Sequence, residues 1–238
     1  MKFSIIISDP PWEFSDRLTM SKVKRGAAAH YNTLSIDELC ELKVKDICDP
    51  DGTVLCLWVI GSMLEDGLRV MKSWGFSQKQ ILVWNKIKQE PLQSLKKAIK
   101  SSNATTQSSI DKEIDQFSLN STLSFGMGHL WRQCHEICLV GINNTKIYKK
   151  LKNKSQRSVF FAANEKHSTK PNALHESLDL MFPDTSDYKL NRLEMFARRQ
   201  YPGWYSIGNE ILVNGVAEDI RDSLARLKAQ NELSSIVT

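Results

Sequence analysis

The sequence lacks the marks of several common protein classes. Its longest apolar stretch, Thr53 to Leu64, is too short to cross a bilayer, and we do not expect its first residues to act as a signal peptide. Its 5 cysteines include no Cys-x-x-Cys pair, so neither a disulfide framework nor a zinc site is expected. No Gly-x-Gly-x-x-Gly follows the first apolar strand, which argues against a dinucleotide-dependent dehydrogenase. What remains is an ordinary globular composition, with 41% hydrophobic and 25% charged residues.

Short apolar strands alternate with amphipathic helices along most of the chain. The predicted strands are Phe3–Ser8, Thr53–Val59, Gln80–Trp84, His135–Ile142, Ser158–Ala162 and Arg192–Ala197. The predicted helices start at Ser35-x-x-Glu38, at Ser62-x-x-Glu65 and at Pro171, with a last one over Asp219–Ala229. This alternation predicts an α/β fold, a doubly wound and mostly parallel sheet with helices on both faces. Such sheets bind ligands beyond the carboxyl ends of their strands.

Residues 88–124 interrupt this alternation. Apolar residues at helical spacing, on both sides of a polar run SSNATTQSS, predict two short amphipathic helices within the segment. Its five lysines and four acidic residues nearly balance, which suits base contacts or a protein partner better than unspecific phosphate binding. We therefore expect one domain over 1–238, with an insertion at about 88–124. A tolerated surface loop is the alternative interpretation of this insertion.

The sharpest local signal is Asp9-Pro10-Pro11-Trp12, directly after the first predicted strand. The prolines fix the backbone and remove two N–H donors, which leaves a carboxylate and a carbonyl as neighbouring acceptors beside an aromatic ring. Two acceptors and a stacking face suit a planar group that carries an amine. Taken alone, the tetrapeptide is equally compatible with a strand-ending turn and a core tryptophan.

Together with other blocks, this motif resembles the MT-A class of adenine-N6 methyltransferases. That class is typified by the catalytic subunit of the eukaryotic mRNA adenosine methyltransferase and has many bacterial and phage members. The further blocks follow the family's order: HYNTLSIDEL (30–39), LWVIGSMLEDGLRVMKSWGF (57–76), FGMGHLWRQCHEICLVG (125–141), KHSTKP (166–171), and LEMFAR to PGWYSIGNE (193–210). The resemblance implies a Rossmann-like methyltransferase fold of permuted motif order, in which the catalytic motif precedes the cofactor-binding segments.

The resemblance also implies a set of site residues. The catalytic residues would be Asp9, Pro10, Pro11 and Trp12, with Asp9 and the Pro10 carbonyl accepting hydrogen bonds from the adenine amine. The residues expected at the nucleic acid are Trp12, Tyr31, Arg132 and His135. Lys149, Lys150 and Lys152 are added because of the charge of the basic run, not because of the resemblance. The residues expected at S-adenosyl-L-methionine are Asp9, Lys170, Glu194, Phe196, Arg198, Gln200, Asn209 and Glu210. No metal is expected, because the chemistry requires none.

The implied reaction is methyl transfer to the N6 amine of adenine. DNA is the expected substrate, since the chain is compact and carries no zinc fingers; RNA and a non-catalytic partner role are the alternatives. Two basic runs, Arg17–Arg25 and Asn143–Ser158, favour a polyanionic partner. We expect a cytoplasmic protein of a prokaryotic cell or a phage-infected host, with no membrane partner, and the sequence leaves a homodimer or a heterodimer open.

Overall fold

The computed structural model describes residues 1–13, 33–101, 106–115, 117–126, 128, 130–163 and 169–236. Two expectations, the role of Tyr31 and the basic run Arg17–Arg25, lie outside these residues. Within the described part of the chain, no helix is long and apolar enough to cross a membrane.

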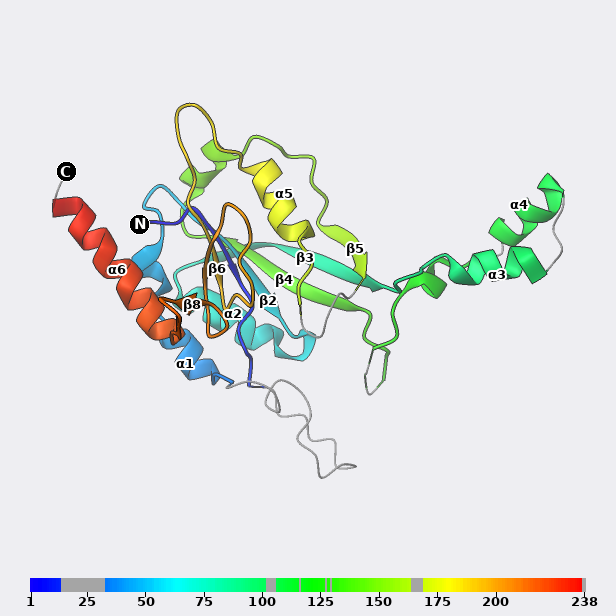
Figure 1. The fold of residues 1–238 in the computed structure, drawn as a ribbon, viewed down its shortest axis with the longest axis horizontal. Coiled ribbons are helices and arrows are strands. Elements are labelled where there is room, and N and C mark those ends of the chain that lie inside the picture. Colours follow the sequence, from blue (N-terminus) through cyan, green and yellow to red (C-terminus); the bar gives the residue numbers. More distant parts are fainter. Residues whose placement is uncertain are drawn as a thin grey trace, which may run out of the picture. The chain divides into compact units, whose positions relative to one another are not determined.

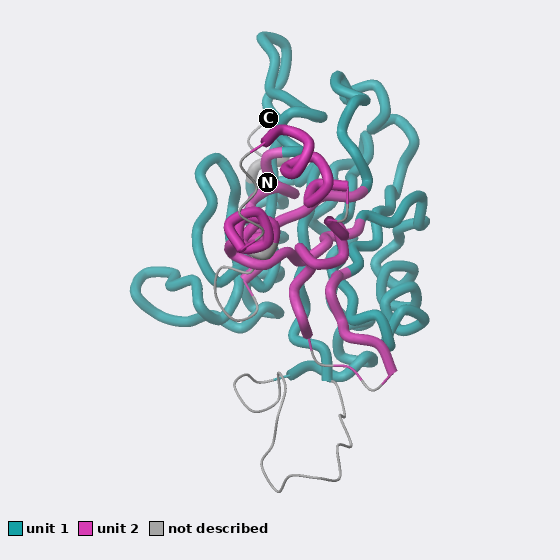
Figure 2. Tube along the Cα trace, turned by 90° about the vertical axis from the view of Figure 1, so that its right-hand side faces the viewer, with its two compact units in different colours: residues 1–82, 137–158, 177–238 teal, residues 83–136, 159–176 magenta. Residues whose placement is uncertain are grey.

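The described chain forms two compact units, each assembled from segments that are far apart in the sequence (Figure 2). Unit 1 consists of Met1–Leu82, Ile137–Ser158 and Ser177–Thr238, and unit 2 of Val83–Glu136 and Val159–Glu176. Neither unit is a continuous piece of sequence. Two of the boundaries between the units, at 82/83 and at 136/137, fall inside strands of the sheet. The insertion at 88–124 belongs entirely to unit 2.

Seven strands form one sheet in the order β5-β3-β4-β2-β1-β6-β7 (Figure 1). The strands are β1 (Ile5–Ser8), β2 (Val54–Val59), β3 (Ser77–Ile87), β4 (His135–Ile142), β5 (Val159–Ala163), β6 (Arg192–Met195) and β7 (Tyr205–Ile207). β1 is parallel to β2 and β6, β6 to β7 and β3 to β5, whereas β2 and β4 are antiparallel. The expected mostly parallel, Rossmann-like α/β sheet is confirmed. Its strand order reverses beside β1, which lies between β2 and the later strand β6.

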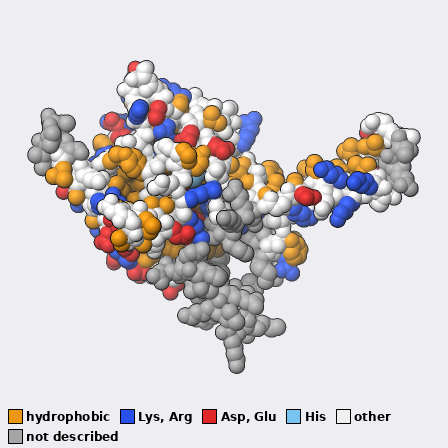
Figure 3. All heavy atoms as spheres, viewed as in Figure 1, with side chains coloured by type: hydrophobic (Ala, Val, Ile, Leu, Met, Phe, Trp, Pro, Cys, Tyr) orange, Lys and Arg blue, Asp and Glu red, His pale blue; other side chains and the backbone are white. Residues whose placement is uncertain are grey.

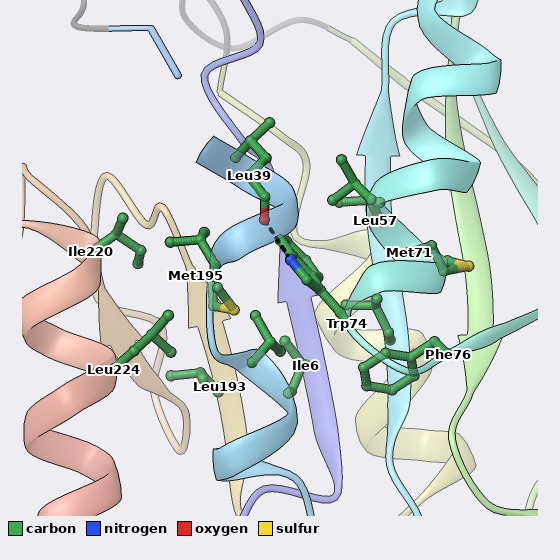
Figure 4. Close-up of a cluster of buried hydrophobic side chains, with 14 of the residues drawn as sticks. Ile6, Leu39, Leu57, Met71, Trp74, Phe76, Leu193, Met195, Ile220 and Leu224 are labelled. Carbon is green, nitrogen blue, oxygen red and sulfur yellow. Dashed lines mark hydrogen bonds between the residues drawn. The ribbon is translucent and has the colours of Figure 1, made fainter. Parts of the chain in front are cut away.

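The main core of unit 1 packs strands against helices on one face of the sheet (Figure 4). The helices are α1 (Ile36–Glu41), α2 (Leu64–Ser73) and α6 (Ile220–Ile236). Trp74, 1% exposed, donates its indole N–H to the Leu39 carbonyl at 2.7 Å, as the dashed line in Figure 4 shows. Since a buried N–H without an acceptor is costly, this bond ties α1 to the end of α2.

Local signals predicted most, but not all, of the remaining elements. The capping box of Ser35 and Glu38 is present at α1. The predicted cap by Ser62 is wrong: a short 3-10 turn over Gly61–Met63 comes first, and α2 then begins without a side-chain cap. The two amphipathic helices of the insertion are confirmed as α3 (Gln93–Ser101) and α4 (Gln107–Asp115). α5 (Ala173–Met181) follows Pro171, while β7 and the hairpin of β8 (Leu212–Val213) and β9 (Val216–Ala217) were not predicted.

Candidate active site

The DPPW motif (Asp9–Trp12) leaves the sheet at the carboxyl end of β1. All four residues of β1 are buried, and the half-buried Asp9 follows directly. Ser8 pairs with Met195 of the parallel strand β6, so Asp9 and Phe196 are the residues that follow these two paired positions. The motif therefore lies at the carboxyl edge of the sheet and beside the reversal of strand order, where doubly wound sheets bind ligands.

The two prolines form a tight turn held by backbone hydrogen bonds. The N–H of Trp12 donates to the Pro10 carbonyl at 2.9 Å, and the N–H of Leu34 donates to the Pro11 carbonyl at 3.0 Å. A carbonyl oxygen has two lone pairs, so the first bond leaves Pro10 able to accept a second donor. The turn thus fixes one acceptor next to the Asp9 carboxylate.

Trp12 is a core residue in this structure. Its side chain is 3% exposed, and its indole N–H donates to the Trp58 carbonyl on β2 at 3.0 Å. This contact anchors the turn to the neighbouring strand. Stacking of Trp12 on a base stays a prediction.

A second backbone feature shapes the same edge at the ends of β6 and β7. Phe196 has φ of 60°, a conformation that is uncommon for a bulky residue and persists only where the surroundings impose it. Gly208 approaches it closely, since a Cβ at Gly208 would lie 2.8 Å from the Ala197 nitrogen and 2.9 Å from the Phe196 carbonyl carbon. Only glycine fits there, and it brings the chain of Asn209 and Glu210 beside the end of β6.

Polar side chains gather around this backbone contact. Arg198 is half-buried, and its Nε lies 3.8 Å from a carboxylate oxygen of the exposed Glu210. Asn209 and Gln200 are exposed, and Glu194 is half-buried within β6, opposite Ile7. The sequence-predicted cofactor residues of unit 1 are therefore carried by the ends of β1, β6 and β7 and by β6 itself.

Unit 2 contains a carboxylate between two lysines. The carboxylate oxygens of Glu136 lie 2.6 Å from the Lys86 ammonium and 3.2 Å from the Lys170 ammonium. All three side chains are less than one-third exposed. Burial would raise the pKa of the Glu136 carboxyl, but attraction to Lys170 and the hydrogen bond from Lys86 outweigh it and hold the pKa below its usual range. The cluster thus has two cations for one anion, and it holds Lys170 in position.

The sequence interpretation assigned a role to His135 in this segment but none to Glu136. His135, half-buried, begins β4, and its backbone carbonyl accepts a hydrogen bond from the Gln133 side chain. The exposed Arg132 places its guanidinium 4.7 Å from the Phe125 ring centroid. No local sequence signal marks Glu136, because its contact with Lys86 depends on β4 lying next to β3 in the sheet.

The predicted basic run lies at the other end of β1. The Lys150 ammonium is 2.8 Å from a carboxylate oxygen of Asp49. The same oxygen accepts a hydrogen bond from the Ser4 hydroxyl at 2.6 Å. Ser4 precedes β1 and the DPPW motif follows it, so Lys150 lies at the amino edge of the sheet. Lys149 and Lys152 are exposed. Any phosphate contact made by these lysines would therefore lie away from the motif.

Comparison with known proteins gives a consistent result. The MT-A70 family profile matches residues 3–117 and 114–210. The chain is 26% identical over 230 residues to the Arabidopsis thaliana protein called N(6)-adenosine-methyltransferase MT-A70-like, which covers 95% of this chain and 26% of the plant protein. It is 25% identical over 230 residues to the type II methyltransferase M.MunI of a Mycoplasma species, covering 90% of this chain and 80% of M.MunI.

Human N(6)-adenosine-methyltransferase catalytic subunit METTL3 is 24% identical over 229 residues, which cover 95% of this chain and 31% of METTL3. The chain thus spans about a quarter of the length of two of its plant relatives, at 26% and 25%. The family match covers far more than half of the chain and includes the DPPW motif at the end of β1. The chain therefore belongs to the MT-A70 family of methyltransferases.

Proposed function

We propose that the protein transfers a methyl group from S-adenosyl-L-methionine to the N6 amine of adenine in DNA. The observation that carries this proposal is the DPPW motif at the carboxyl end of β1, beside the reversal of strand order. We favour DNA, the substrate expected from the sequence, and a type II methyltransferase is among the relatives. RNA is the second candidate, supported by the adenosine methyltransferases among the relatives. Such an enzyme would act in the cytoplasm of a prokaryotic or phage-infected cell.

The nucleophile is the difficult part of this reaction, because the adenine amine shares its lone pair with the ring. The Asp9 carboxylate and the Pro10 carbonyl offer two acceptors for its two N–H groups. Binding both would favour a pyramidal nitrogen and stabilise the positive charge that develops on it. The bond from Trp12 to Pro10 holds one acceptor in place before the substrate arrives. Asp9 need not act as a base, because the methylated ammonium readily loses its proton.

The residues at the ends of β6 and β7 fit a cofactor with ribose hydroxyls, an adenine and a charged amino-acid end. Gly208 keeps the backbone close, and Arg198, Asn209 and Glu210 supply donors and acceptors. The buried Ser206 hydroxyl of β7 has no hydrogen-bond partner among the described residues. S-adenosylmethionine supplies a methyl group already activated by its sulfonium, so the protein's task is mainly alignment.

Lys170 is the residue that we assign to the cofactor's carboxylate, as the family resemblance implies. Its ammonium lies 3.2 Å from a carboxylate oxygen of Glu136. Glu136, held in turn by Lys86, would then serve as a positioning residue for Lys170.

The test is transfer of labelled methyl groups to DNA and to RNA in parallel reactions, followed by mapping of the modified base. We expect label at the N6 position of adenine in DNA, and none without the cofactor. Label in RNA alone would replace DNA by the second candidate. Saturable cofactor binding with no transfer to either nucleic acid would contradict a catalytic role.

A further inference from the structure

The insertion separates its charges between its two helices. α3 has three lysines and no acidic residue, whereas α4 has three acidic residues and one lysine. These charged residues are Lys96, Lys97 and Lys100 on α3, and Asp111, Lys112, Glu113 and Asp115 on α4. The near balance of charge over the whole segment hides this separation. The net charge of the segment therefore does not show how each helix would interact with phosphates.

The three lysines occupy one side of α3. At 100° per residue, positions 96, 97 and 100 fall within an arc of roughly 100°. Leu95 and Ile99 lie on the other side and are half-buried, consistent with the contact between α3 and α4. In Figure 3 the blue side chains of this segment gather along α3.

These lysines have no acidic partner in the part of the chain that the structure describes. All three side chains are exposed, and among the described residues no carboxylate lies within ion-pairing distance of them. Lys86 and Lys150, by contrast, each pair with a carboxylate. The side of α3 formed by Lys96, Lys97 and Lys100, here the lysine face, is thus a concentrated and uncompensated positive patch.

We propose that the lysine face of α3 binds the phosphate backbone of the nucleic acid substrate. The proposal rests on the proposed function, which supplies a polyanionic substrate. Lysines that contact phosphates release condensed counterions and give affinity that does not depend on base sequence. The acidic residues of α4 repel the same backbone, so they direct it to α3. The insertion would therefore contribute affinity and positioning, in place of the base recognition that its net charge suggested.

The test is the salt dependence of binding to duplexes of unrelated sequence. The variant K96Q/K97Q/K100Q is compared with the charge-matched control K43Q/K45Q/K72Q, which neutralises three exposed lysines in another part of the chain. Each lost phosphate contact lowers the slope of log K against log salt by about 0.9, so we expect the α3 variant to lose about 2 to 3 units on every duplex. The control should keep the wild-type slope. K96R/K97R/K100R should keep it as well, because it preserves the charge.

Calorimetry with S-adenosylmethionine and circular dichroism show whether the α3 variant is folded, and both should match the wild type. A wild-type slope in the folded α3 variant would overturn the proposal. If light scattering showed a changed oligomeric state together with that unchanged slope, the lysine face would be assigned to a protein contact instead. If wild-type protein binds duplexes but methylates neither DNA nor RNA, the proposed function fails, while the slope still tests α3.

Discussion

The two ends of β1 differ in how fully their polar groups are paired within the protein. At the amino end, Asp49 accepts hydrogen bonds from Ser4 and Lys150, and the Thr53 hydroxyl donates to the Phe3 carbonyl at 2.7 Å. At the carboxyl end, the buried Ser8 hydroxyl has no hydrogen-bond partner among the described residues. The same short strand therefore has an amino end whose polar side chains are paired within the protein, and a carboxyl end with a buried hydroxyl that is not paired among the described residues, directly before the DPPW motif.

Backbone conformation shows the same difference. The carboxyl end lies beside Phe196, with φ of 60°, and Gly208, whose position excludes a Cβ. Strained and close-packed backbone of this kind is typical of functional sites, where the surrounding fold compensates its cost. We therefore expect substitutions at the carboxyl end to act mainly on activity and those at the amino end mainly on stability.

The largest effect is expected at Asp9. Asp9→Asn keeps the shape of the side chain but replaces a charged acceptor, and the methyl-transfer rate should fall by about 100-fold or more. The midpoint of thermal unfolding should stay near the wild-type value, because the side chain follows the strand and is only half-buried. A variant that retains more than about a tenth of the activity would contradict the paired-acceptor mechanism.

The next effect is on stability, at the other end of the strand. Asp49→Asn removes the negative charge beside the half-buried Lys150 and should lower the free energy of unfolding at pH 7 by roughly 1–3 kcal/mol. The turnover of folded protein should be unchanged. Urea unfolding curves and a methyl-transfer assay on the same samples measure both quantities, and a loss of turnover without a loss of stability would reverse the assignment of the two ends.

The pH dependence of this second effect has a definite sign. Burial would raise the pKa of the Asp49 carboxyl, but hydrogen bonds from Lys150 and Ser4 outweigh it, so the folded-state pKa is lower than that of the unfolded chain. The stabilisation is therefore present above the unfolded pKa, about 4, and is lost as the pH falls through the folded pKa. The difference between wild type and Asp49→Asn should shrink in unfolding curves recorded at decreasing pH below about 4.

A smaller effect is expected at Gly208. In Gly208→Ala, the new Cβ meets backbone atoms of Phe196 and Ala197 at 2.8–2.9 Å, so the segment of Asn209 must move away. The dissociation constant for S-adenosylmethionine should rise by about tenfold, the equivalent of 1–2 kcal/mol of overpacking. Gly215→Ala is the matched control, because Gly215 also has positive φ, at 82°, but has nothing within 4 Å of an added Cβ. Equal cofactor affinity in both variants would remove the Gly208 contact from the site.

The smallest effect is expected at the exposed lysines near the amino end. We retain the sequence-based proposal that Lys149 and Lys152 contact phosphate, and K149Q/K152Q should lower the salt slope by up to about 2 units. Lys150→Gln should instead lower stability and leave the slope unchanged, since Lys150 is paired with Asp49. If K149Q/K152Q has the wild-type slope, the amino end of β1 has only a structural role, and the functional difference between the two ends of the strand is larger than proposed.

Local patterns in the sequence were sufficient for several elements, including β1, but not for β7, which carries part of the site. The apolar run before two prolines predicts β1 and its end, because the prolines remove the donors that a ladder needs. Ser35 and Glu38 predict the start of α1, since each side chain bonds the other's backbone N–H. Helical spacing of apolar residues predicts α3 and α4. Each of these signals concerns residues a few positions apart, whose geometry the backbone itself fixes.

Only the tertiary structure decided which distant residues meet. Nothing in the basic run distinguishes Lys150, paired with a residue 101 positions away, from the exposed Lys149. The position of Glu136 between Lys86 and Lys170 depends likewise on strand pairing, and the burial of Trp12 depends on the place of β2. Such contacts depend on register between strands, and a one-residue shift would turn every side chain to the other face. Composition and spacing therefore determined which chemistry the chain carries, and packing decided which charges remain available for it.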